Sequence, residues 1–156
     1  MERTLVMLKP DAVHRGLVGR LIARLEDKGL KVVALKMARI DRATAEQHYA
    51  EHEGKAFYEP LLRFVTGGPT VFMVLEGNGA VAVVRKLMGA TFGPDAAPGT
   101  LRGDFGVSKR FNLVHGSDSP DSAEKEIALF FEPDDLLDWD PVTWPWHYDF
   151  SSGEAV

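Results

Sequence analysis

The hydrophobic and polar positions of this 156-residue chain follow two patterns. Leu17, Leu21 and Leu25 recur every four residues, a spacing that places them on one face of an amphipathic helix. Residues 70–75 read Thr-Val-Phe-Met-Val-Leu, a β-branched and apolar run typical of a buried strand. The same patterns predict strands over residues 4–8, 30–40, 70–75 and 113–115. They predict helices over residues 17–28, 41–52, 55–66, 79–88 and 119–131.

The order of these elements favours an α/β or α+β sandwich, and a split βαββαβ motif is one arrangement that fits it. Residues 9–11, Lys-Pro-Asp, should end the first strand in a loop. The stretch 89–106 is long and rich in Gly and Pro, and connections of that length are usually functional. Residues 134–139 are expected to add one helical turn before an aromatic tail over residues 139–156. No repeat or linker divides the chain, so we expect one domain over residues 1–156.

Charge and composition narrow the functional class. The chain has 18 Lys and Arg against 23 Asp and Glu, a net charge of −5, which argues against a general nucleic-acid binder. The absence of cysteine excludes disulfides and thiol catalysis and suits a reducing cytosol. No segment approaches the ~18 consecutive apolar residues of a membrane span. The apolar N-terminal run ends at Lys9, too early for a signal peptide. We therefore expect a soluble cytoplasmic protein.

A polar constellation surrounds His115, in the run Asn112-Leu-Val-His-Gly-Ser-Asp-Ser119. His115 stands at the end of a predicted strand. Ser119-Pro120 opens the next helix, whose free N–H groups favour an anion such as phosphate. A neutral imidazole there could attack phosphorus and form a covalent intermediate. Glu126, inside that helix, could reach back and hold one tautomer of the ring. The local pattern leaves a plainer alternative open, a turn histidine followed by an ordinary serine cap.

Cationic side chains stand beside predicted strand ends and the long loop. Lys9 follows the first strand, and Arg85 lies on the helix after the third strand. Thr91 and Arg102 flank the loop rich in Gly and Pro. Arg binds phosphate through two parallel donors and Lys binds it as a point charge. Each cation alone also suits an ordinary solvated surface, and only convergence in space separates the two interpretations.

Phe57, Tyr58 and Leu61 lie close together on a predicted helix. They could form an apolar platform on which a base stacks, or a helix face packed on the core. In the tail, the three Trp residues stand near Tyr148 and Phe150, and burial against the parent subunit or against a neighbour fits equally well. The enrichment in Trp favours a subunit contact.

The run His48-Tyr-Ala-Glu-His52 matches the H-x-x-E-H pattern of some zinc proteases. On one continuous helix, histidines four residues apart share a face, as a metal site requires. The same spacing arises by chance on a polar helix face, and no later segment supplies an obvious third ligand. A zinc hydrolase is therefore the weaker alternative, which metal analysis would test.

The run around His115 closely resembles the active-site motif N-x-x-H-G-S-D of the nucleoside diphosphate kinase family. Further runs that resemble the family's motifs follow in the same order along nearly the whole chain. They lie at residues 8–13, 15–19, 48–61, 68–69, 98–105 and 122–127. Several separate motifs in the right order are far more specific than any one of them.

This resemblance implies a ferredoxin-like sandwich, a four-stranded antiparallel sheet of βαββαβ type covered by helices. It implies transfer of the γ-phosphoryl group of a nucleoside triphosphate to a nucleoside diphosphate by a ping-pong mechanism through phosphorylated His115. By the same match the catalytic group also contains Glu126 and Ser117, which would orient His115, and Lys9, Tyr49 and Glu51. The implied nucleotide-binding residues are Lys9, Phe57, Leu61, Arg85, Thr91, Arg102 and Asn112.

The resemblance also implies Mg²⁺ carried by the nucleotide phosphates rather than by a metal site of the protein, and assembly into a homo-oligomer. The loop 98–103 and the extended tail favour a hexamer, as a trimer of dimers, over a tetramer. The alternative function is a catalytically inactive, nucleotide-binding regulatory module of the same fold. One departure from the family pattern, Phe92-Gly93 after Thr91, concerns the shape of the nucleotide loop.

Overall fold

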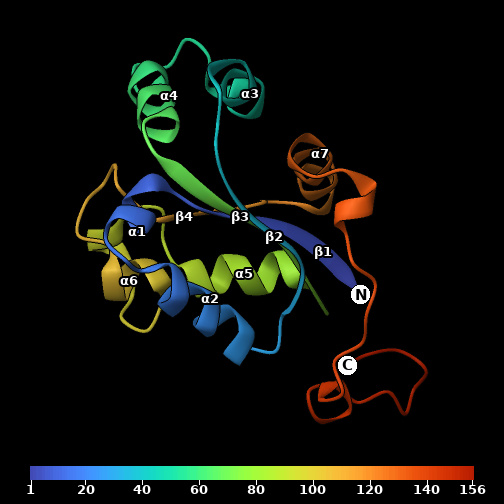
Figure 1. The fold of residues 1–156 in the computed structure, drawn as a ribbon. Helices are drawn as coiled ribbons and strands as arrows, with labels where there is room; N and C mark the ends of the chain where they lie inside the picture. The colour runs from blue at the N-terminus through green and yellow to red at the C-terminus, as the bar shows by residue number, and fades with distance from the viewer.

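The computed structural model describes all 156 residues, and its four strands form one antiparallel sheet (Figure 1). The strands are β1 (Glu2–Leu8), β2 (Lys31–Arg39), β3 (Pro69–Gly77) and β4 (Val114–Gly116), in the order β2-β3-β1-β4. This is the predicted βαββαβ arrangement, with β1 in the interior between β3 and β4. Because β4 pairs with β1 over three residues, Met7 lies opposite His115.

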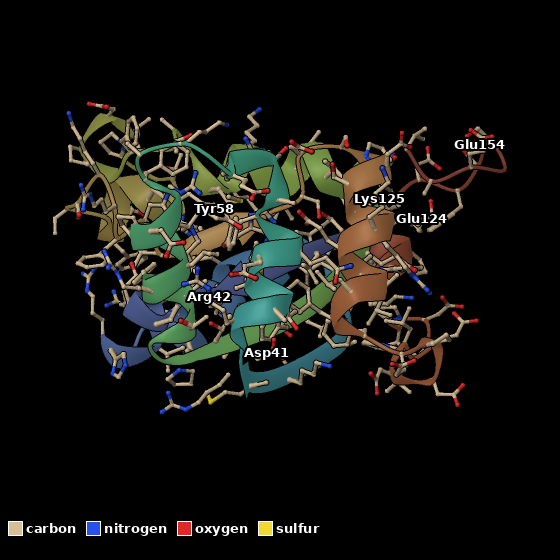
Figure 2. The ribbon with its side chains drawn as sticks, turned by 90° about the horizontal axis from the view of Figure 1, so that it is seen from above. Asp41, Arg42, Tyr58, Glu124, Lys125 and Glu154 are labelled. Atoms are coloured by element: carbon tan, nitrogen blue, oxygen red, sulfur yellow. The ribbon has the colours of Figure 1, made fainter.

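Helices cover both faces of the sheet (Figure 1). They are α1 (Pro10–His14), α2 (Val18–Asp27), α3 (Arg42–His48), α4 (Tyr58–Thr66), α5 (Ala80–Met88), α6 (Leu101–Phe105) and α7 (Pro120–Phe130). One face carries α2 and α5, and the opposite face carries α3, α4 and α7. Figure 2 looks down on these last three, which lie side by side with Asp41 at the start of α3. Asp41 caps that helix by accepting the Thr44 N–H at 2.8 Å.

Two hydrophobic cores follow from the alternation of side chains along β1. Val6 and Leu8 point to the core under α2 and α5, whereas Leu5 and Met7 point to the core under α3, α4 and α7. All four side chains are fully buried, which explains why the first strand reads as an unbroken apolar run. The strand is therefore fixed on both faces, and the side chains that follow its end are held in place with it.

The structure corrects several predicted boundaries. Residues 10–14 form a short helix rather than a loop, because Pro10 presets φ at the first helical position. The helix predicted over residues 41–52 ends at His48, and the chain resumes as a 3₁₀ turn over Ala50–His52. The stretch 89–106 contains α6, which is capped by the Thr100 hydroxyl accepting the Gly103 N–H at 3.0 Å. The helical turn predicted at residues 134–139 lies at Pro133–Asp135.

The aromatic tail returns to the sheet edge formed by β2 (Figure 1). Lys31 is buried there, with its Nζ 2.6 Å from Glu76, 2.7 Å from the Trp139 carbonyl oxygen and 4.5 Å from the centre of the Trp144 ring. Two of the three Trp side chains therefore pack on their own subunit, whereas Trp146 stays 90% exposed. No helix of the chain has the length and apolarity needed to cross a bilayer.

Candidate active site

A cleft of about 1750 Å³ opens between α4, the loop that ends in Asn112, and the start of α7. Its wall contains the proposed site residues except Ser117, which lies fully buried directly behind it. Tyr58, offered with Phe57 and Leu61 as an apolar platform, packs against the core instead and does not line the cleft. The fold thus brings together side chains from both ends of the chain. The cations Lys9, Arg85 and Arg102 all line this one cleft. Their convergence favours a binding site over an ordinary solvated surface.

His115 lies on the short edge strand β4, with its side chain at the floor of the cleft. Its Nε2 is 3.0 Å from both carboxylate oxygens of Glu126 on α7. Glu126 also accepts a hydrogen bond from the Ser117 hydroxyl at 2.6 Å. A carboxylate only accepts hydrogen bonds, so in the neutral ring the proton sits on Nε2 and the lone pair on Nδ1. No hydrogen bond from the protein occupies Nδ1.

The charge state of Glu126 follows from two opposed effects. Burial raises the pKa of its carboxyl, but the hydrogen bond and charge of His115 and the hydrogen bond from Ser117 outweigh burial and lower that pKa overall. Glu126 is therefore an ionised acceptor at neutral pH. An ionised acceptor holds the imidazole in one tautomer and in one orientation.

His48 and Tyr49 form a buried layer behind His115. The His48 ring packs edge to face on His115 with ring centres 4.8 Å apart, and Tyr49 packs on His48 at 4.4 Å. Burial, followed by the nearby His115, lowers the pKa of His48 to about 3, so this ring stays neutral. Burial raises the pKa of Tyr49. Glu51 is exposed at the rim, where it faces His52 at 3.5 Å.

The structure overturns the zinc interpretation of the H-x-x-E-H run. Because α3 ends at His48, the two histidines are not on one continuous helix face. His52 instead contacts Lys55 and Glu51 through its two ring nitrogens. The donor group that does form is His48, His115 and Glu126, within 4.8 Å of one another. It offers one carboxylate and two imidazoles, a set that does not suit Mg²⁺, which prefers oxygen ligands.

Lys9 and Asn112 form the next part of the site. The Lys9 Nζ, at the end of β1, donates to the Asn112 Oδ1 at 2.8 Å, and the Asn112 Nδ2 donates to the Thr91 carbonyl oxygen at 2.9 Å. Burial, followed by the nearby charge of Arg102, lowers the pKa of Lys9 to about 8. The Lys9 side chain is therefore mostly charged at pH 7 and loses its charge near pH 8.

The two arginines differ in how firmly they are held. Arg85 is exposed and makes one long contact, 3.4 Å to the Gly116 carbonyl oxygen. Arg102 is buried, and burial followed by the charge of Arg85 lowers its pKa to about 10. Its guanidinium donates to four backbone carbonyl oxygens, those of Asn112 (3.1 Å), Val114 (2.7 Å), Gly89 (3.2 Å) and Ala90 (3.4 Å). Arg102 therefore ties the loop to β4 and leaves few donors for a ligand.

Apolar rings line the outer part of the cleft. Phe57 is 48% exposed at the start of α4, and Leu61 follows one turn later on the same side. Phe92 and Phe111 also line the cleft and are about half exposed. Sequence reasoning missed Phe111 as a site residue, because a single aromatic in an irregular loop carries no periodicity. The sequence did single out Phe92, as a departure from the family pattern beside Thr91.

The family model for nucleoside diphosphate kinase matches residues 2–136. The chain belongs to the nucleoside diphosphate kinase family. A nucleoside diphosphate kinase of Archaeoglobus fulgidus is 56% identical over 149 residues, covering 96% of this chain and 99% of the relative. A nucleoside diphosphate kinase of a Nocardioides species is 64% identical over 129 residues, covering 83% of this chain and 96% of the relative.

Solved structures agree with the family assignment. That of a halophilic nucleoside diphosphate kinase from Halobacterium salinarum in complex with CDP superimposes with a TM-score of 0.93 at 55% identity. The match covers 95% of this chain and 99% of that chain. The predicted ferredoxin-like fold and the assignment to a phosphotransferase family are thereby confirmed. The relatives give no support to the alternative of an inactive regulatory module.

Proposed function

We propose that the protein moves the γ-phosphoryl group of a nucleoside triphosphate to a nucleoside diphosphate through phosphorylated His115. The observation that carries this proposal is the free Nδ1 of His115, opposite an Nε2 held by the ionised Glu126. The Nδ1 lone pair forms a bond to the γ-phosphorus while the bond to the β,γ-bridging oxygen breaks. The first diphosphate leaves with that electron pair. An oxygen of the second diphosphate then attacks the phosphorus and Nδ1 leaves as a neutral nitrogen.

Glu126 and Ser117 act through the ring. While Nδ1 bonds to phosphorus, positive charge develops on the imidazole, and the Glu126 carboxylate stabilises it 3.0 Å from Nε2. Ser117 keeps that carboxylate in place through its 2.6 Å hydrogen bond. Tyr49 supports the layer of His48 behind the nucleophile, and Glu51 forms the rim of the cleft.

The remaining cleft residues suit a nucleotide from its phosphates to its base. Lys9, Arg85 and Arg102 offset phosphate charge, which is the main requirement of phosphoryl transfer. Asn112 and Thr91 supply polar contacts to the phosphates and sugar. Phe57 and Leu61 present an apolar face to the base, and stacking on such a face tolerates any base. The CDP bound by the Halobacterium relative is a nucleoside diphosphate, which supports this class of substrate.

We assign Mg²⁺ to the nucleotide and treat the magnesium complex as the substrate. The donor set His48, His115 and Glu126 does not suit this ion, and two of its members are already hydrogen-bonded to each other. The nucleotide phosphates would hold the ion together with water, so the protein needs no metal cage of its own. Bound there, the ion neutralises charge on the phosphates of the nucleotide.

The test uses γ-labelled ATP with Mg²⁺ and no acceptor. We expect the protein to take up label that is labile to acid and stable to base, and to pass it to an added nucleoside diphosphate. Label that binds but does not move to the diphosphate would contradict the ping-pong route. Folded protein that takes up no label would contradict the proposed function as a whole.

The pH dependence of the reaction should report Lys9. Its pKa is lowered to about 8, so the side chain is a cation below that pH and neutral above it. We expect kcat/KM to fall by about tenfold between pH 7 and pH 9, because the free enzyme loses a phosphate-binding charge. Lys9→Arg keeps its charge throughout this range and should lose the basic limb. A limb at the same pH in Lys9→Arg would show that another group causes it.

We further propose a hexameric assembly, as a trimer of dimers, working in the cytoplasm without nucleic acid or membrane partners. The loop over residues 98–103 and the extended tail support the hexamer, and a chain without cysteine suits a reducing compartment. Sedimentation should give a mass near six subunits. A mass near four subunits would contradict the hexamer.

A further inference from the structure

The backbone is strained two residues before His115. Leu113 has φ of +69°, and it is the only residue other than glycine with a positive φ. The Val114 N–H donates to the Asn112 carbonyl oxygen at 2.7 Å, which closes a three-residue γ-turn centred on Leu113. A γ-turn with positive φ is rare and strained, and the Cβ atom of any residue other than glycine disfavours that conformation. The Leu113 side chain is nevertheless fully buried in the core under α2 and α5.

Asp11 holds this turn from outside the cleft. Its Oδ2 accepts the Leu113 N–H at 3.0 Å, across a separation of 102 residues in the sequence. On the other side of the same residue, the Leu113 carbonyl oxygen accepts the Lys9 N–H at 2.8 Å. Both polar groups of the strained residue are thus fixed by the segment that follows β1. Asp11 does not line the cleft, so it is not placed to contact a nucleotide.

The turn decides where the site residues point. It sends the Leu113 side chain into the core while Asn112, immediately before it, faces the cleft and meets Lys9. Immediately after it, Val114 enters β4 and pairs with Leu8, which places His115 opposite Met7. If Leu113 were extended, side chains would alternate along this segment, and Asn112 and His115 would lie on opposite faces of it.

We propose that Asp11 is a positioning residue for the phosphotransfer, whose carboxylate holds the γ-turn at Leu113 so that Asn112 and His115 face the same cleft. This role rests on the proposed function. It also explains why the Lys-Pro-Asp run at residues 9–11 contains an acid. Lys9 faces the cleft, Pro10 starts α1, and Asp11 secures the turn.

The test compares Asp11→Ala with Asp11→Asn. Alanine removes the acceptor of the Leu113 N–H, and we expect kcat to fall by about tenfold and KM for the nucleoside diphosphate to rise several-fold. Asparagine keeps an oxygen acceptor of the same reach, and it should restore kcat/KM to within about threefold of wild type. Asp41→Ala is the matched control, because Asp41 also accepts a backbone N–H but lies at the far end of α3 (Figure 2). It should lower stability and leave kcat and KM unchanged.

A second comparison uses Leu113→Gly, since glycine adopts positive φ without strain. In that background the loss caused by Asp11→Ala should shrink to less than about threefold, because the turn no longer depends on the carboxylate. Asp11→Ala with wild-type kcat and KM and only a lower unfolding midpoint would overturn the positioning role. So would an Asp11→Asn variant as impaired as the alanine variant. Wild-type protein that takes up no label would instead overturn the phosphotransfer, and this role with it.

Discussion

His115→Ala takes up no label from γ-labelled ATP and loses roughly 10⁴-fold or more in kcat, while it folds as the wild type does. The size of this loss follows from the role of the side chain, because removal of a nucleophile abolishes the covalent route rather than weakening it. The histidine is only partly buried at the cleft floor, so its truncation leaves no large cavity. Nucleotide affinity, measured by calorimetry, should change little, which separates lost chemistry from lost binding.

His14→Ala is the matched control for that experiment. His14 is an exposed histidine on α1 and is not part of the cleft. The variant should label and turn over as the wild type does. If His115→Ala still took up acid-labile phosphate, another histidine would carry it, and the assignment of the nucleophile to β4 would be wrong.

Arg102→Ala is expected to lose both stability and activity. Its guanidinium donates to four carbonyl oxygens that the alanine variant leaves without their donor. We expect unfolding in urea to show a loss of about 3 kcal/mol or more, since buried unsatisfied groups are costly. We expect kcat/KM to fall by roughly 10²–10³-fold, because the variant loses a phosphate-binding charge and the support of the strand that carries His115.

Arg85→Ala separates these two contributions. Arg85 is exposed and makes only the 3.4 Å contact to Gly116, so its loss should change stability by no more than about 0.5 kcal/mol. Its kcat/KM should still fall strongly, because the cation faces the cleft. Arg102→Lys should recover little of the stability of Arg102, since one ammonium cannot bridge four carbonyls. An Arg102→Ala variant as stable as wild type would contradict the structural role.

The sequence alone predicted several strands and helices of this protein and its family. The unbroken apolar run at residues 4–8 predicted a buried strand, and Leu5, Val6, Met7 and Leu8 are indeed fully buried. The periodicity of residues 17–28 predicted a helix whose Leu21 and Leu25 face the core. Such local patterns determine elements because helices and strands expose and bury side chains at fixed intervals. The ordered motifs around His115 predicted the family, which the comparisons confirm.

Short-range chemistry set the boundaries that periodicity missed. The helix predicted to run to His52 stops at His48, and α6 forms inside what the sequence presented as a loop. Helices of five residues, such as α1 and α6, carry too few positions for a periodic signal. Their starts depend on single residues, a proline in one case and the cap of Thr100 in the other.

Only the tertiary structure decided how the site is assembled. It joins Lys9 to Asn112 across 103 residues and Asp11 to Leu113 across 102 residues, through contacts that no local pattern encodes. It commits Arg102 to backbone carbonyls and leaves Arg85 with one long contact to Gly116, although the sequence presents both as cations of one kind. It also lowers the pKa of Lys9 and leaves the Nδ1 of His115 open. Burial and the direction of hydrogen bonds, which set these properties, exist only once the sheet has brought the distant segments together.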